Sequence, residues 1–98
     1  PHYQLYFAEN GKEGLDVILK EKIDLVISDC EMPVGNGPWL LMELSKVRPR
    51  LPVIIMTGLV SATPEEFFQS GACAFFRRPF PIPDFIHTVE KSLKMDLA

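Results

Sequence analysis

Three polar residues, each at the end of an apolar stretch, are the side chains best suited to chemistry in this chain. Asp29 ends the run IDLVISD, Thr57 follows residues 52–56, and Arg78 follows residues 73–77. If these stretches are parallel strands, their carboxyl ends meet at one edge of the sheet. A carboxylate can accept a phosphoryl group, and a hydroxyl and a cation can bind the phosphoryl oxygens. The sequence therefore predicts a phosphoryl-accepting site around Asp29.

Strands and helices are expected to alternate along the chain. Short apolar or aromatic runs between turn residues predict strands, and apolar residues at helical spacing predict helices. This alternation is typical of an α/β fold with a parallel sheet and helices on both faces. Residues 23–28 are nearly all apolar, which indicates a strand covered on both faces. The expected strands are residues 3–8, 23–28, 52–56 and 73–77, and the expected helices are residues 12–22, 39–47, 64–70 and 84–94.

Local signals indicate where the last two helices begin and end. Thr63 and Glu66 fit a capping box at the start of the third helix, and Gly71 is a natural C-cap for it. Asp84 is the expected N-cap of the last helix. A rigid, proline-rich loop over residues 79–83 is expected before that helix.

Size and composition limit the classes of function. The 98 residues are enough for one small domain, residues 1–98. The net charge is −3 and the arginines form no patch of the kind that binds nucleic acid or an anionic membrane. No apolar run is long enough to span a bilayer. Cys30 and Cys73 form no metal-binding motif, so two free thiols in a reduced, cytoplasmic setting are expected.

Four motifs follow one another along the chain: AENGKEGL, IDLVISDCEMPVGNG, VIIMTG and GACAFFRRPF. The second is similar to a strand leading into Asp-x-x-Met-Pro-x-x-x-Gly, the third to a strand ending in Thr-Gly, and the fourth to a Gly-Ala run that leads to Lys-Pro-Phe. In this order the motifs resemble the response-regulator receiver domain, the phosphoacceptor module of two-component signalling. The resemblance covers essentially the whole chain. It implies a flavodoxin-like doubly wound sheet of strand order 2-1-3-4-5.

The resemblance also implies a role for individual residues. Asp29 matches the phosphoacceptor, Thr57 the switch hydroxyl that turns toward the phosphoryl group, and Phe75 the aromatic side chain whose rotamer reports activation. Glu31 matches the residue that offers a backbone carbonyl to Mg²⁺, which Asp29 also ligates. Arg78 stands where the family has a lysine, and its guanidinium keeps the charge and binds phosphate as a planar fork. In the family this bond to proline is cis, so a cis peptide bond is expected after Arg78.

The chain departs from the family pattern at its start. The family's first strand and most of its first helix are absent from these 98 residues, so residues 3–8 align with the second strand. The absent strand carries the acidic pair that holds Mg²⁺ with the phosphoacceptor. Asp29 with one backbone carbonyl is a poor magnesium site, so the metal is expected in an intact domain. The gap in the sheet should be filled by another subunit, as in a homodimer, or by pairing of the two flanking strands.

These residues are compatible with more than one function. The leading hypothesis is a receiver domain that is phosphorylated by a histidine kinase or a phosphotransfer protein, with or without a downstream effector domain, and that is not an enzyme beyond its own phosphoryl transfer. Arg78 and the absent acidic pair motivate an alternative, a pseudo-receiver that serves as a phosphorylation-independent interaction or dimerisation module. A small hydrolase with Asp29 as nucleophile ranks lower, because no second acid or base follows a strand end. In the plainest reading Asp29 only forms a turn and Arg78 is a solvated charge.

Overall fold

The computed structural model describes residues 4, 6–30, 37–58 and 64–97 and has the expected α/β architecture. Within these residues the sheet is parallel, with strand order β1-β2-β3. This is the order expected for the last three strands of a 2-1-3-4-5 sheet. The elements are α1 (Gly11–Lys20), β1 (Val26–Asp29), α2 (Gly37–Val47), β2 (Val53–Thr57), α3 (Pro64–Gln69), β3 (Ala74–Arg77) and α4 (Ile82–Leu97).

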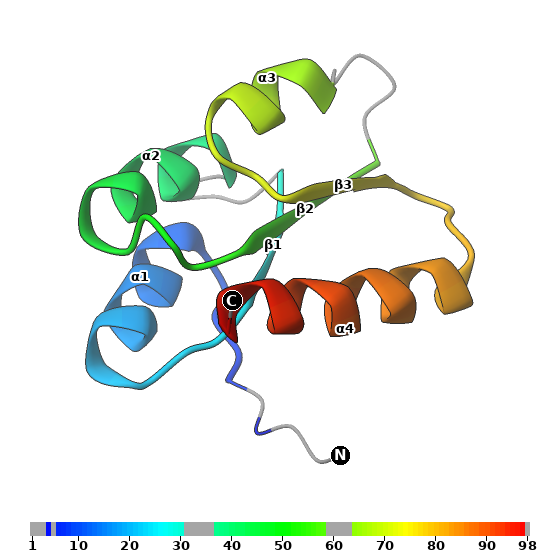
Figure 1. Ribbon diagram of the computed structural model, residues 1–98. Coiled ribbons are helices and arrows are strands. Elements are labelled where there is room, and N and C mark those ends of the chain that lie inside the picture. Colours follow the sequence, from blue (N-terminus) through cyan, green and yellow to red (C-terminus); the bar gives the residue numbers. More distant parts are fainter. Residues whose placement is uncertain (1–3, 5, 31–36, 59–63, 98) are drawn as a thin grey trace.

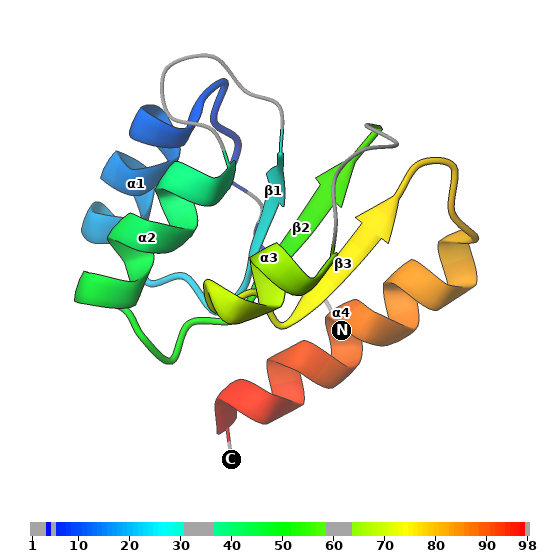
Figure 2. The ribbon, with the colours of Figure 1, turned by 90° about the horizontal axis from the view of Figure 1, so that it is seen from above.

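Helices cover both faces of the sheet, and α4 lies on the far side of it from α3 (Figure 1). α1 and α2 lie side by side next to β1 (Figure 2). On the face that α1, α2 and α3 share, buried apolar side chains form one core cluster: Ile18, Leu40, Leu41, Leu44, Val53, Ile55, Phe67 and Ala72. On the other face Phe76 contacts Phe85 of α4, with ring centroids 5.3 Å apart. Alternate residues of β2 and β3 therefore supply the two layers of the core.

Capping explains the bounds of two helices. Asn10 caps α1, since its side-chain oxygen accepts a hydrogen bond of 2.8 Å from the backbone N–H of Glu13. Gly71 ends α3 with a φ of 109°, as expected for a C-cap glycine. Thr63 lies outside the described residues, so the expected capping box stays a prediction. Apart from the expected strand over residues 3–8, the predicted helices and strands lie within a few residues of the observed ones.

The start of the last helix differs from the prediction. α4 begins at Ile82, so Asp84 lies in its first turn and is not the N-cap. The backbone N–H of Phe85 donates to the carbonyl of Pro81 at 3.3 Å, which closes the first turn. Pro83 is compatible with this turn because its missing N–H would have no partner there in any case. The expected loop over residues 79–83 is therefore shorter than predicted.

The expected first strand, residues 3–8, is not confirmed. Gln4 and the segment 6–8 form no strand, and the Phe7 side chain is 82% exposed. Strand propensity depends on packing against a neighbouring strand, and no strand pairs with the outer edge of β1 within the part of the chain that the structure describes. The expectation that the flanking strands pair to close the gap is thus wrong for these residues, while filling by another subunit stays a prediction.

β1 is also shorter than expected and is not covered on both faces. It spans Val26–Asp29, and Ile27 is 42% exposed. A cavity of about 660 Å³ lies beside it, lined by the amino-terminal segment, α1, β1 and α4, including Phe7, Ile18 and Leu93. The prediction of two-sided burial fails because the apolar composition of a strand does not show whether a neighbouring element is present to cover it.

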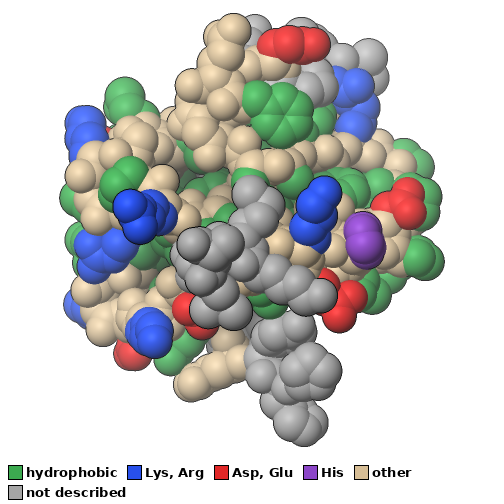
Figure 3. Space-filling view, viewed as in Figure 1, with side chains coloured by type: hydrophobic (Ala, Val, Ile, Leu, Met, Phe, Trp, Pro, Cys, Tyr) green, Lys and Arg blue, Asp and Glu red, His purple; other side chains and the backbone are tan. Residues whose placement is uncertain are grey.

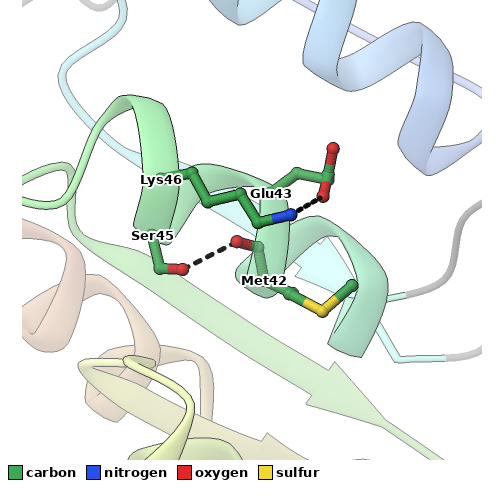
Figure 4. A network of polar contacts seen from close by, with 4 residues as sticks. All are labelled: Met42, Glu43, Ser45 and Lys46. Atoms are coloured by element: carbon green, nitrogen blue, oxygen red, sulfur yellow. Dashed lines mark hydrogen bonds and ion pairs between the residues drawn. The ribbon is translucent and has the colours of Figure 1, made fainter.

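The face of the molecule drawn in Figure 3 has mixed polarity. Hydrophobic side chains reach it at several separate places on the face drawn in Figure 3, between acidic and basic ones. On the exposed side of α2, Lys46 pairs with Glu43 at 3.2 Å and the Ser45 hydroxyl donates to the Met42 carbonyl at 2.7 Å (Figure 4). Such i, i+3 contacts on an exposed face add only a few tenths of a kcal/mol, roughly 0.2–0.5 per ion pair. None of the described helices has the length and apolar composition that crossing a membrane requires.

Candidate phosphoryl-accepting site

The three strand-end residues meet at one edge of the sheet, as predicted. Asp29 is the last residue of β1, Thr57 is the last residue of β2, and Arg78 directly follows β3. Nη2 of Arg78 donates a hydrogen bond of 2.5 Å to Oδ2 of Asp29, and the two groups form an ion pair. The backbone N–H of Arg78 donates to the Thr57 carbonyl at 2.8 Å. The expected cis peptide bond between Arg78 and Pro79 is confirmed.

The acid and the cation are accessible, whereas the hydroxyl is not. The Asp29 side chain is 34% exposed and the Arg78 side chain 43% exposed, so an incoming molecule can reach both. Thr57 is completely buried beside them in the sheet. An ion pair this exposed adds at most about 1 kcal/mol to stability. The pair therefore stabilises the fold little and leaves the carboxylate open to reaction.

The backbone after Asp29 is held from two sides. The N–H of Cys30 donates to the Met56 carbonyl of β2 at 2.7 Å. The carbonyl of Cys30 accepts from the N–H of Gly37, the first residue of α2, at 3.3 Å. The Asp29 carbonyl accepts from the Ser28 hydroxyl at 3.1 Å. The peptide that carries the carboxylate is thus fixed between β2 and the start of α2.

The comparison with known proteins identifies the family of this chain. The model of the response regulator receiver domain family matches residues 1–90 of this chain. The chain belongs to this family. The receiver domain is therefore a signalling module of two-component response regulators, as the motifs around Asp29, Thr57 and Arg78 led us to expect.

Some relatives of this receiver domain are much longer than the chain, and others are of similar length. The chain is 37% identical over 98 residues to the transcriptional regulatory protein GlrR of Escherichia coli K12, an alignment that covers 94% of the chain and 21% of GlrR. It is 33% identical over 94 residues to sporulation initiation phosphotransferase F of Bacillus subtilis, covering 95% of the chain and 76% of that protein. The chain thus spans about a fifth of the length of GlrR.

Solved receiver structures have the same fold. The receiver domain of NtrX from Brucella abortus superposes with a TM-score of 0.82 at 26% identity, covering 94% of this chain and 79% of that one. A receiver domain of Francisella gives a TM-score of 0.79 at 32% identity, covering 89% and 73% of the two chains. The expected flavodoxin-like class is therefore confirmed.

The residue expected to be the switch aromatic is stacked in the core. The ring of Phe75 stacks on Phe67 of α3 at 5.3 Å between centroids, and the guanidinium carbon of Arg77 lies 5.7 Å from the centre of the Phe75 ring. Our sequence reasoning missed Arg77. The signal for it was the period-2 alternation of strands, which puts residues 75 and 77 on one face of β3. Phe75 therefore contacts both an aromatic ring and a cation.

The described residues do not by themselves form a magnesium site. Receiver domains generally bind Mg²⁺, but residues 4, 6–30, 37–58 and 64–97 include no group of three acidic, histidine or cysteine side chains that could hold a metal. Asp29 supplies one carboxylate, and one of its oxygens already accepts from Arg78. Glu31, the expected source of a backbone carbonyl, lies outside the described residues. Magnesium requires several oxygen ligands in near-octahedral geometry, and this donor set falls short of that.

Proposed function

We propose that Asp29 accepts a phosphoryl group from a phosphohistidine of a histidine kinase or phosphotransfer protein, and that the acyl phosphate switches a protein-binding surface of this domain. One observation carries the proposal: an accessible carboxylate at a strand end lies in direct contact with the guanidinium of Arg78. Such a cation binds phosphoryl oxygens with charge-assisted hydrogen bonds. The carboxylate and its counter-ion together suit acceptance of an anionic group.

The proposed transfer is a nucleophilic displacement at phosphorus. A carboxylate oxygen of Asp29 attacks the phosphorus atom, so that a new O–P bond forms as the P–N bond of the phosphohistidine breaks. The imidazole nitrogen leaves with the electron pair of that bond and takes up a proton. Hydrolysis later returns Asp29 to a carboxylate and releases inorganic phosphate. Arg78 stabilises negative charge on the phosphoryl oxygens throughout, and the Thr57 hydroxyl supplies a further hydrogen bond to them.

The register of the sheet suggests how the site and Phe75 communicate. Thr57 lies beside Arg77 in the pairing of β2 with β3, and the Arg77 guanidinium lies over Phe75. A movement of Thr57 toward a phosphoryl group therefore acts first on the strand segment that carries Arg77. We expect phosphorylation to shift the population of Phe75 rotamers in this way and so to alter the surface around β3 and α3.

Uptake of a phosphoryl group tests the proposal directly. The protein is incubated with phosphoramidate or acetyl phosphate and Mg²⁺, and its intact mass is followed. We expect a mass increase of one phosphoryl group that hydroxylamine removes, because an acyl phosphate is labile to this nucleophile. Borohydride reduction followed by peptide mass spectrometry should localise the adduct to Asp29. A folded protein that gains no mass would reject the proposal and favour the pseudo-receiver, an interaction module independent of phosphorylation.

Replacing Arg78 should slow phosphoryl uptake without unfolding the domain. Arg78→Ala is expected to reduce the rate about tenfold, less than removal of a buried oxyanion donor because this side chain is partly solvated. Its free energy of unfolding should change by less than about 1 kcal/mol. Arg78→Lys, the control, keeps the positive charge and should retain most of the rate. Uptake by Arg78→Ala at the wild-type rate would identify Arg78 as a solvated surface charge.

A further inference from the structure

Gly37 is packed against the backbone of the residue that carries the reactive carboxylate. A Cβ atom at Gly37 would lie 3.0 Å from the carbonyl oxygen of Asp29, 3.1 Å from Cα of Cys30 and 3.4 Å from Cδ1 of Ile55. The first two contacts are tighter than nine in ten real Cβ contacts, and both involve backbone atoms. Unlike the end of a flexible side chain, these atoms belong to the backbone, so relieving the contacts requires a backbone shift, either at Asp29 and Cys30 or at the start of α2.

The close approach is part of the hydrogen bonding that fixes the Asp29–Cys30 peptide. Gly37 is buried, and its N–H donates to the Cys30 carbonyl at 3.3 Å. The N–H of Cys30 donates to the Met56 carbonyl at 2.7 Å. The start of α2 and the strand β2 therefore hold this peptide between them. The Asp29 side chain extends from the same peptide to Arg78.

Glycine is required at position 37 because there is little room for a Cβ atom, and not because of the backbone conformation. Among the described glycines only Gly71 has a positive φ. An alanine at position 37 could therefore adopt the same backbone conformation without left-handed strain. Its methyl group would instead press on the Asp29–Cys30 peptide. The expected effect is a shift of a few tenths of an ångström in the position of the carboxylate relative to Arg78.

We infer that Gly37 is a positioning residue for the phosphoacceptor: by allowing α2 to begin against the Asp29–Cys30 peptide, it sets where the carboxylate meets Arg78 and the incoming phosphorus. This inference rests on the proposed function for its consequence in the reaction. Small displacements matter in such a step, since a misplacement of about 1 Å can lower a rate about a hundredfold. Gly37 acts through Asp29 and does not touch the reacting atoms.

The test compares Gly37→Ala with Gly14→Ala. A Cβ at Gly14, in α1, would meet only the Ala8 side chain at 3.6 Å, an ordinary contact. Two readouts are taken: the maximal rate of phosphoryl uptake from phosphoramidate, and the Nε–Hε signal of Arg78 in ¹⁵N NMR spectra without any phosphodonor. We expect Gly37→Ala to lower the rate about tenfold and to move the Arg78 signal, and Gly14→Ala to change neither. An unmoved Arg78 signal with an unchanged rate would overturn the inference.

The two readouts separate this inference from the proposed function. If the wild-type protein takes up no phosphoryl group, the proposed function fails, and the Arg78 signal still reports whether residue 37 positions Asp29. If Gly37→Ala does not fold, the double variant Gly37→Ala/Ile55→Val is used, with Ile55→Val as its reference. It removes the Cδ1 contact and leaves the two backbone contacts, so the same shift of the Arg78 signal is expected. A double variant with the signal of its reference would contradict the inference.

Discussion

Asparagine at position 29 should abolish phosphoryl uptake while the domain stays folded. The side-chain amide is uncharged and is a far weaker nucleophile than a carboxylate. Its oxygen still accepts a hydrogen bond from Arg78, and the exposed ion pair contributes less than about 1 kcal/mol. We therefore expect no hydroxylamine-labile mass increase in Asp29→Asn, with an unfolding midpoint close to that of the wild type. Intact-mass spectrometry and urea unfolding measure the two effects.

Asp24→Asn is the matched control for that variant. Asp24 is an exposed carboxylate just before β1, five positions from Asp29. It has the same chemistry but lies at the opposite end of the strand from Arg78. Asp24→Asn should take up the phosphoryl group at the wild-type rate. Labelling of Asp29→Asn to the wild-type extent would mean that another residue is the acceptor.

The meeting of Asp29 and Arg78 could be predicted because it depends only on strand direction. Parallel strands end at the same edge, so strand direction places these two residues, 49 positions apart, at one edge of the sheet. Because β2 lies between their strands, the contact itself also requires the long Arg78 side chain. The cis bond after Arg78 was a different kind of prediction, since it came from the family resemblance alone. Both are confirmed. The chemical roles of Asp29, Thr57 and Phe75 stay predictions, because geometry shows contacts and not reactivity.

The failed predictions have a common physical origin. Residues 3–8 have strand-forming composition, yet Gln4 and residues 6–8 form no strand. Residues 23–28 have the composition of a strand buried on both faces, yet β1 is exposed on one of them. In both cases the outcome depends on a neighbouring element, and the residues themselves carry no information on whether that neighbour is present. The contacts of Arg77 and Gly37 were missed for a related reason, although Gly37 is the final glycine of the Asp-x-x-Met-Pro-x-x-x-Gly motif. Each contact is with a particular partner, Phe75 or the Asp29–Cys30 peptide, which composition and spacing do not reveal.

The exposed face of β1 leads to a sharp prediction about stability. Ile27 of β1 and Ile54 of β2 are register partners and so lie side by side on the same face of the sheet. Ile54 is completely buried, whereas Ile27 is 42% exposed. Truncating a buried isoleucine removes apolar contacts and leaves a cavity, which costs about 2–5 kcal/mol. Ile54→Ala should therefore lower the free energy of unfolding by that amount, a large part of the roughly 5–15 kcal/mol typical of a domain.

Ile27→Ala is the matched control, because it makes the same chemical change on the neighbouring strand. The Ile27 side chain is already partly in water, so we expect Ile27→Ala to lower the free energy of unfolding by less than about 1 kcal/mol. This is well below the cost of truncating a fully buried side chain. Urea unfolding of both variants, with m-values compared to the wild type, separates a loss of stability from a change in the surface exposed on unfolding. Equal losses would show that Ile27 is covered in solution, and would contradict an open β1 face. Ile27 lines the cavity beside β1. If the loss of unfolding free energy in Ile27→Ala depends on protein concentration, a second copy of the chain covers this face of β1.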